Sequence, residues 1–221
     1  MKRFVIKGNI CYSSENKELC VMKNGYAVCD DGICAGTYEE LPECYETFRC
    51  YDYSDKLIIP GFADLHVHAP QYSFRGLGMD LELLDWLNTH TFIEEAKYQE
   101  LDYAEKAYDI FAEDMLKSPT TRACVFGTIH NEATLLLMKK LENAGIKGFV
   151  GKVNMDRNSP EYICEESPEK SAEDTEAWIQ KAEKFENIRP IITPRFIPTC
   201  SDELMEKLSV LQKKYHLPMQ S

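Results

Sequence analysis

The sequence lacks the features of several common protein classes. No apolar stretch approaches the ~20 residues that cross a bilayer, and the start, Met1-Lys2-Arg3-Phe4, leads into polar residues instead of a signal-peptide core. Basic residues are few, because 25 Lys and Arg stand against 37 Asp and Glu, for a formal net charge of −12. Binding to nucleic-acid phosphates needs clustered Lys and Arg. We therefore expect a cytoplasmic protein with a small-molecule substrate and with neither a nucleic-acid nor a membrane partner.

Paired cysteine motifs are also missing. The nine cysteines form no Cys-x-x-Cys pair and their number is odd, so we expect reduced thiols instead of disulfides or a zinc knuckle. Hydrophobic residues make up 44% of the chain, which is enough to bury a sizeable core. This composition excludes a disordered chain.

Residues 1–59 are typical of a small antiparallel β module. Gly, Asn or Asp turn residues bound three short strand-like runs, at 4–10, 25–29 and 32–36. Near Pro60 the pattern changes, and strand-like segments begin to alternate with long helical ones. We therefore predict two domains, residues 1–59 and residues 60–221.

Alternation in the second domain predicts a parallel sheet. Its helical stretches carry apolar residues at spacings of three and four. Strands are expected at 62–67, 121–129, 148–153 and 189–193, with another beginning at 218–221, and helices at 81–116, 133–144, 171–185 and 201–215. Ser171 and Ser201 are the expected N-caps of the last two helices. This order favours a β/α barrel over an open sheet.

The number of predicted strands bears on the fold class. A closed β/α barrel needs eight strands, whereas only four complete ones and the start of a fifth are predicted here. The predicted class is α/β, with the first half of a TIM-like (β/α)8 barrel preceded by a small β-sandwich segment. Because residues 217–221 have the composition of a buried strand, we expect the chain to stop in the middle of its fold.

The strongest local motif is His66-Val67-His68, at the end of the first strand of the second domain. Residues two apart on a strand point to the same face, so both imidazoles can bind one ion. Imidazole nitrogen suits zinc, and active sites of β/α barrels lie at the carboxyl ends of their strands. The alternative is a pair of strand histidines satisfied by neighbouring groups, which the preceding apolar strand and the Pro60-Gly61 break disfavour.

Three further residues are candidates for binding a heterocycle. Gln71 follows the histidine pair and carries both donors and an acceptor. Arg195 follows the fourth strand and can place its planar guanidinium on a carbonyl and an adjacent ring nitrogen, while Phe196 can stack on a ring. A solvated Gln71, and an Arg195 paired with one of the chain's many carboxylates, are the alternatives that the residues alone leave open.

Other conspicuous side chains are expected to be structural. Trp86 and Trp178 lie on helical stretches and favour packing, and Glu165-Glu166 is typical of a solvated surface. His130 lies just past the second strand, within reach of the site, whereas His216 is expected to be exposed.

Taken together, these segments resemble a known family. The run Pro60-Gly61-Phe62-Ala63-Asp64-Leu65-His66-Val67-His68 is similar to the metal-binding first strand of the amidohydrolase superfamily. Its continuation, Ala69-Pro70-Gln71-Tyr72-Ser73-Phe74, is similar to the guanine deaminase branch. Further matches to that branch occur at 85–87, 91–92, 128–130, 149–156 and 193–196, so the resemblance covers roughly residues 57–221.

This resemblance implies zinc-dependent hydrolysis of guanine to xanthine and ammonia, with Zn as the cofactor. It implies metal binding by His66 and His68, and purine binding by Gln71, Arg195 and Phe196. The remaining metal ligands and the general acid/base are expected beyond Ser221, so no catalytic residue is expected within this chain, which we expect to be a truncated form. The resemblance also implies a full-length homodimer, and an incomplete composite β-sandwich at the N terminus.

Two other functions stay open. Another aminated heterocycle, such as cytosine, adenine or a triazine, is the alternative substrate, although Gln71 and Arg195-Phe196 favour guanine. An inactive fragment that binds a partner or nothing is the second alternative, and it predicts exposed apolar surface.

Overall fold

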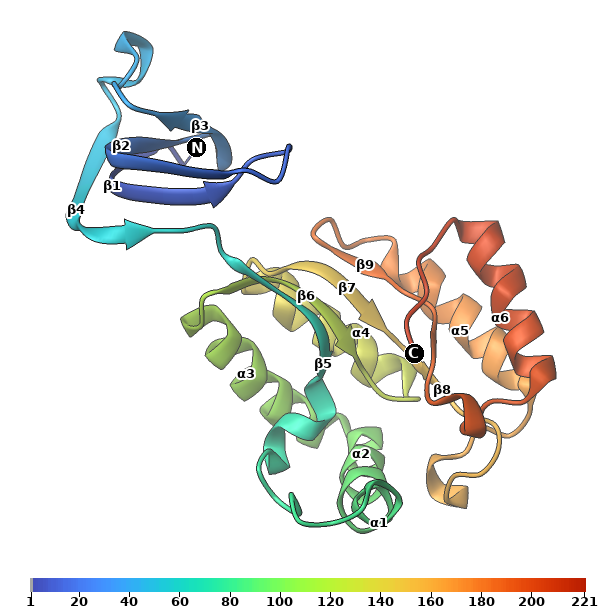
Figure 1. Ribbon diagram of the computed structural model, residues 1–221. Helices are drawn as coiled ribbons and strands as arrows, with labels where there is room; N and C mark the ends of the chain where they lie inside the picture. The colour runs from blue at the N-terminus through green and yellow to red at the C-terminus, as the bar shows by residue number, and fades with distance from the viewer. Residues whose placement is uncertain (1) are drawn as a thin grey trace. The chain divides into compact units, whose positions relative to one another are not determined.

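The computed structural model describes residues 2–221 and divides after Gly61 into two compact units (Figure 1). The domain boundary expected from the sequence, between residues 59 and 60, lies two residues earlier. Within residues 2–221, no helix is both long and apolar enough to cross a membrane. Each of the nine cysteines is a free thiol.

The N-terminal unit is a four-stranded sheet in the order β3-β2-β1-β4. Its elements are β1 (Phe4–Ser13), β2 (Leu19–Asp30), β3 (Ile33–Tyr38), the short 3-10 helix η1 (Glu43–Tyr45) and β4 (Arg49–Ile58). Asp31 and Gly32, which join β2 to β3, both have positive φ, 52° and 82°. Two consecutive residues of positive φ match the right-handed twist of the strands, which is why Asp-Gly favours a tight hairpin here.

The expectation of a purely antiparallel module is wrong at one edge of this sheet. β1 pairs antiparallel with β2 but parallel with β4, a strand that the sequence did not predict. None of the β4 side chains is buried, and only the short run 51–54 alternates between tyrosine and polar residues, beside the charged Asp55 and Lys56. An alternation of four residues gives only a weak period-two signal.

The C-terminal unit contains a parallel sheet in the order β5-β6-β7-β9. Its strands are β5 (Phe62–His68), β6 (Thr120–Phe126), β7 (Lys147–Gly151) and β9 (Ile188–Pro190). A second parallel pair joins β8 (Val153–Asn154) to β10 (Thr193–Pro194), and an isolated parallel bridge joins Ile192 to Met219. The α/β class and the parallel order predicted from the sequence are thus confirmed.

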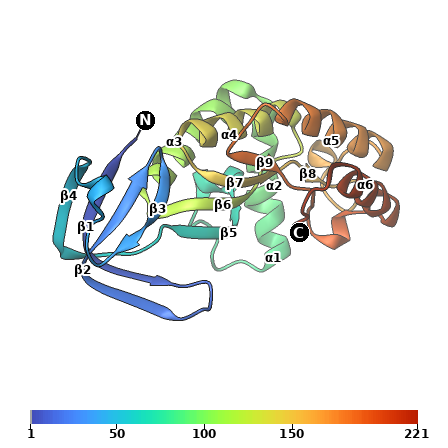
Figure 2. The same cartoon turned by 90° about the horizontal axis from the view of Figure 1, so that it is seen from above.

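Among residues 62–221, four long helices lie along one side of these strands (Figure 2). They are α3 (Leu101–Lys117), α4 (Asn131–Asn143), α5 (Pro168–Ala182) and α6 (Asp202–Tyr215). Val125 and Val150 from the sheet belong to one fully buried cluster with Leu137, Trp178 and Leu204 from the helices. Each large apolar side chain buried in this way contributes about 1.5–3 kcal/mol, and together they hold the strand ends in fixed positions.

The single helix expected over residues 81–116 is divided into several pieces. The structure has α1 (Leu83–Trp86), the π-helical turn η3 (Leu87–Thr91), α2 (Phe92–Ala96), the 3-10 turn η4 (Lys97–Gln99) and then α3. Glu100 is extended, with φ −83° and ψ 109°, and separates α3 from the preceding turns. The apolar spacing continues through the break because both sides are buried: Phe92 packs in one apolar cluster and Tyr108 in another.

One expected helix cap is confirmed and one is wrong. Ser201 caps α6, because its Oγ accepts a hydrogen bond from the Leu204 backbone N–H at 3.1 Å. Ser171 instead lies inside α5, whose cap is Ser167, with Pro168 as the first helical residue. Proline suits that position because it lacks the N–H that would otherwise be unpaired.

Candidate active site

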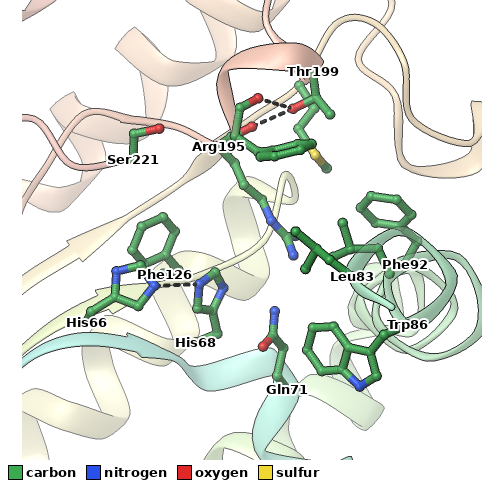
Figure 3. A pocket seen from close by; sticks show the side chains of 13 residues that line it. His66, His68, Gln71, Leu83, Trp86, Phe92, Phe126, Arg195, Thr199 and Ser221 are labelled. Carbon is green, nitrogen blue, oxygen red and sulfur yellow. Dashed lines mark hydrogen bonds between the residues drawn. The ribbon is translucent and has the colours of Figure 1, made fainter. Parts of the chain in front are cut away.

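A cavity of about 460 Å³ opens at the carboxyl ends of the strands in the C-terminal unit (Figure 3). This volume falls within the range of roughly 300–1,000 Å³ that is typical of small-molecule pockets. All the site residues predicted from the sequence line it, namely His66, His68, Gln71, Arg195 and Phe196. Most of the remaining wall is apolar and consists of Leu83, Trp86, Leu87, Phe92, Phe126 and Met155.

The histidine pair lies at the end of β5 with both rings on one face of the strand. The two Nε2 atoms are 3.2 Å apart, as the dashed line in Figure 3 marks. The His68 ring stacks on Phe126, with ring centroids 4.3 Å apart and an interplanar angle of 15°. The backbone N–H of His66 donates to Asp64 Oδ1 at 3.1 Å, which helps to hold the strand end.

This geometry fits two ligands of one zinc ion. Zn–N bonds of about 2.0–2.1 Å in a tetrahedral site place two nitrogens about 3.3–3.4 Å apart, close to the observed 3.2 Å. Burial lowers the pKa of His68 to about 3, with the charges of Arg195 and His66 as smaller causes. A neutral ring keeps the lone pair that a metal needs. Within residues 2–221, no third His, Cys, Asp or Glu completes a metal-binding cluster.

A buried carboxylate, Glu95, joins two of the predicted site residues. Its side chain is 1% exposed and lies on α2. Its Oε1 accepts a hydrogen bond from Gln71 Nε2 at 3.2 Å, and its Oε2 accepts one from Arg195 Nη1 in an ion pair. Arg195 is therefore paired with a carboxylate, which is one of the interpretations that the sequence left open, and it also lines the cavity.

Phe196 lies in a turn that directs it to the rim of the cavity. It is 37% exposed, and its φ of 61° is a left-handed conformation that is rare outside glycine. The turn is closed by Thr199, whose backbone N–H donates to the Phe196 carbonyl at 2.8 Å and whose Oγ1 donates to the Arg195 carbonyl. Backbone strain of this kind is commonly found at binding sites.

Several residues at or near the cavity were not predicted correctly from the sequence. Trp86 was expected to be a packing residue, but it lines the cavity, and its Nε1 donates to the Leu77 carbonyl at 3.0 Å. Glu165, expected on the solvated surface, has a side chain only 7% exposed and is paired with Lys152. Glu95 gave no signal at all, since it follows Glu94 in what resembles an exposed charged stretch.

The other histidines and tryptophan lie elsewhere. His130 precedes α4 and does not line the cavity; burial lowers its pKa, and the nearby Lys152 charge lowers it further. His216 ends α6 and is exposed, as expected. Trp178 is completely buried in the core, also as expected.

Comparison with known proteins identifies the family. Residues 57–221 match the model of the amidohydrolase family. The chain belongs to this family. Among curated amidohydrolase relatives, the guanine deaminase of Rattus norvegicus is 42% identical over 170 residues, which is 75% of this chain and 37% of that protein. The guanine deaminase of Dictyostelium discoideum is 36% identical over 98% of this chain and 52% of its own length.

A solved amidohydrolase structure confirms the fold. The guanine deaminase of C. acetobutylicum, solved with guanine in its active site, superposes with a TM-score of 0.93 at 44% identity. The match covers 100% of this chain and 52% of that one. The predicted class, an α/β fold corresponding to the first half of a TIM-like amidohydrolase barrel, is therefore confirmed, and the chain spans about half the length of this relative.

Proposed function

We propose that this chain carries the purine-binding residues and two metal ligands of a zinc-dependent guanine deaminase. The overall reaction is hydrolytic, since guanine and water give xanthine and ammonia. The observation that supports it most is the convergence of the five predicted residues on one cavity. The guanine deaminases among the relatives, one of them solved with guanine bound, favour this substrate.

In this proposal His66 and His68 bind zinc through their Nε2 atoms. The distance between these atoms and the neutral His68 ring both suit that role. Bound zinc brings the pKa of its water close to 7, so that hydroxide is available at neutral pH. Two imidazoles leave further zinc positions for donors outside residues 2–221, and we place the general acid/base outside these residues as well.

Gln71, Arg195 and Phe196 are proposed to hold the purine. Aromatic and aliphatic side chains form most of the wall, so a flat heterocycle would leave water on entering the cavity. Arg195 can donate to a ring carbonyl, and Phe196 can cover a ring face. Guanine offers such a carbonyl whereas adenine does not, so this contact favours guanine over adenine.

The proposal retains a cytoplasmic location and a homodimeric full-length protein, both expected from the sequence. Cell fractionation tests the location, and sedimentation equilibrium tests the oligomeric state. A sizing column run on this chain also separates a well-behaved protein from one that aggregates through exposed apolar surface.

The decisive test measures zinc content and ammonia release from guanine. Both are measured on this chain and, where the coding sequence continues, on the longer product. His66→Asn and His68→Asn should abolish zinc binding and ammonia release, whereas His216→Asn is the matched control, because His216 is exposed and lies outside the cavity. Ammonia release from adenine or a triazine but not from guanine would favour the alternative substrates. If no form of the protein binds zinc or releases ammonia, the proposed catalysis is wrong and the alternative of a chain without catalysis stands.

A further inference from the structure

Glu95 connects the two polar residues proposed to contact the edge of the purine. It is not among the residues that line the cavity, and its carboxylate is almost completely buried behind them. Gln71 Nε2 donates to one carboxylate oxygen and Arg195 Nη1 to the other. In Figure 3 a nitrogen of Gln71 points toward the guanidinium of Arg195, as expected of two donors that share one carboxylate.

This carboxylate decides which end of the Gln71 amide faces a ligand. A carboxylate paired with a guanidinium accepts hydrogen bonds and has no hydrogen to donate. A Gln71 amide turned the other way would place its oxygen against an oxygen of the buried Glu95 carboxylate, so that two acceptors would face each other without a hydrogen between them. The amide nitrogen therefore stays with Glu95. The Gln71 oxygen makes no hydrogen bond within residues 2–221 and is the atom left for a ligand.

The cavity then offers an acceptor, Gln71 Oε1, beside a donor, the remaining N–H groups of Arg195. A lactam edge, in which a ring N–H lies next to a C=O, matches that order. An amidine edge, in which a bare ring nitrogen lies next to a C–NH2 group, has the opposite order. It places an acceptor against the Gln71 oxygen and a donor against Arg195. We propose that Glu95 is a positioning residue that makes the cavity selective for lactam heterocycles by fixing the Gln71 amide. This inference rests on the proposed function, because it requires that Gln71 and Arg195 contact the ligand.

The neighbouring residue Glu94 provides a matched control. It lies on the same helix and is also buried, but its carboxylate accepts hydrogen bonds from Ser73 at 2.8 Å, Lys97 at 2.6 Å and Tyr103. None of these three partners lines the cavity. Replacing Glu94 therefore disturbs a similar buried network without touching the Gln71 amide.

The experiment compares two probes that differ in this edge. Hypoxanthine carries the lactam edge and lacks the amino group that would be hydrolysed, whereas adenine carries the amidine edge. Their dissociation constants are measured by equilibrium dialysis on the full chain. A preference for hypoxanthine of roughly 5- to 150-fold is expected, which corresponds to the 1–3 kcal/mol of discrimination of one good bidentate pair.

The Glu95→Gln variant tests the orientation argument. The oxygen of the new amide must accept from Arg195, so its nitrogen faces Gln71 and the Gln71 amide turns over. The cavity then offers two donors, the turned Gln71 amide and Arg195. Hypoxanthine and adenine can each pair with only one of them, so the ratio of their dissociation constants should fall toward unity. Glu95→Asp keeps an acceptor-only carboxylate and should keep the preference, even where both affinities fall. Glu94→Gln should keep it too.

The outcomes separate this inference from the function on which it rests. A ratio that falls in Glu95→Gln but survives in Glu95→Asp and Glu94→Gln supports the positioning role. A merely structural role predicts equal losses for both purines, so an unchanged ratio in Glu95→Gln overturns the inference while leaving the proposed function intact. An equal fall in Glu95→Asp also overturns it. A wild-type chain that binds neither probe, nor guanine, overturns both.

Discussion

The buried ion pair between Lys152 and Glu165 offers a sharp test of how the cavity floor is built. Lys152 lies between β7 and β8 with a side chain that is completely buried, and its ammonium also donates to the Val153 carbonyl at 3.2 Å. The other oxygen of Glu165 accepts from the Met155 backbone N–H at 3.0 Å and from Ser171 Oγ at 2.6 Å. Met155 lines the cavity, so one carboxylate links the core to the site.

We predict that Glu165→Gln destabilises the C-terminal unit by about 3–5 kcal/mol. The substitution keeps the shape of the side chain but leaves the Lys152 ammonium in the interior without a counter-charge, which is the costly part of breaking a buried pair. A domain of this size has a total stability of about 5–15 kcal/mol, so the loss is a large fraction of it. The Lys152→Met/Glu165→Gln double variant removes the stranded charge and should recover at least about 2 kcal/mol.

Urea unfolding followed by far-UV circular dichroism measures these free energies. The slope of the free energy against urea should stay unchanged if only the folded state is affected. The reasoning is refuted if Glu165→Gln lies within about 1 kcal/mol of the wild type, a loss typical of an ordinary neutral hydrogen bond. It is equally refuted if the two single substitutions add without coupling in the double variant.

Three further predictions concern the strand ends and a helix cap. Because burial lowers the folded-state pKa of His68 to about 3, the unfolded chain binds this proton first as the pH falls below about 6.5. In metal-free buffer the wild type should therefore lose up to about 2 kcal/mol more between pH 7 and pH 5 than His68→Gln does, and equal losses in urea titrations would contradict this cause. Ser201→Ala should cost about 1 kcal/mol in thermal unfolding through loss of the cap to Leu204, whereas Ser201→Asp should not. Gly151→Ala should yield little folded protein in expression trials, because the added Cβ would clash with the Thr193 side chain.

The part of the site that lies on strands could be predicted from the sequence. Strand periodicity alone places His66 and His68 on one face, and their side chains do share a face of β5. Arg195 and Phe196 follow the fourth predicted strand, and parallel strands bring their carboxyl ends together. Gln71 follows the histidine pair directly, so its place in the cavity follows from that of β5.

The supporting groups could not be predicted, because their burial depends on contacts that are distant in the sequence. Glu95 pairs with Arg195 across 100 positions, and no local pattern encodes such a contact. Glu165 follows a short 3-10 turn, and only the fold places it over Lys152. In each case a charged residue that local patterns assign to the surface is buried because a partner of opposite charge meets it.

The adjacent residues Glu94 and Glu95 show how this burial is arranged. Consecutive residues on a helix point about 100° apart, so two neighbouring carboxylates can both be buried only if two sides of the helix are covered. One side of α2 meets Tyr103 at the start of α3, and the other meets Arg195 after β10. With five residues α2 is too short to be stable alone, so these contacts must hold it in place. Glu95, which orients the Gln71 amide, thus also helps to fix the helix over the cavity, so Glu95→Gln should lower both the lactam preference and the local stability of α2.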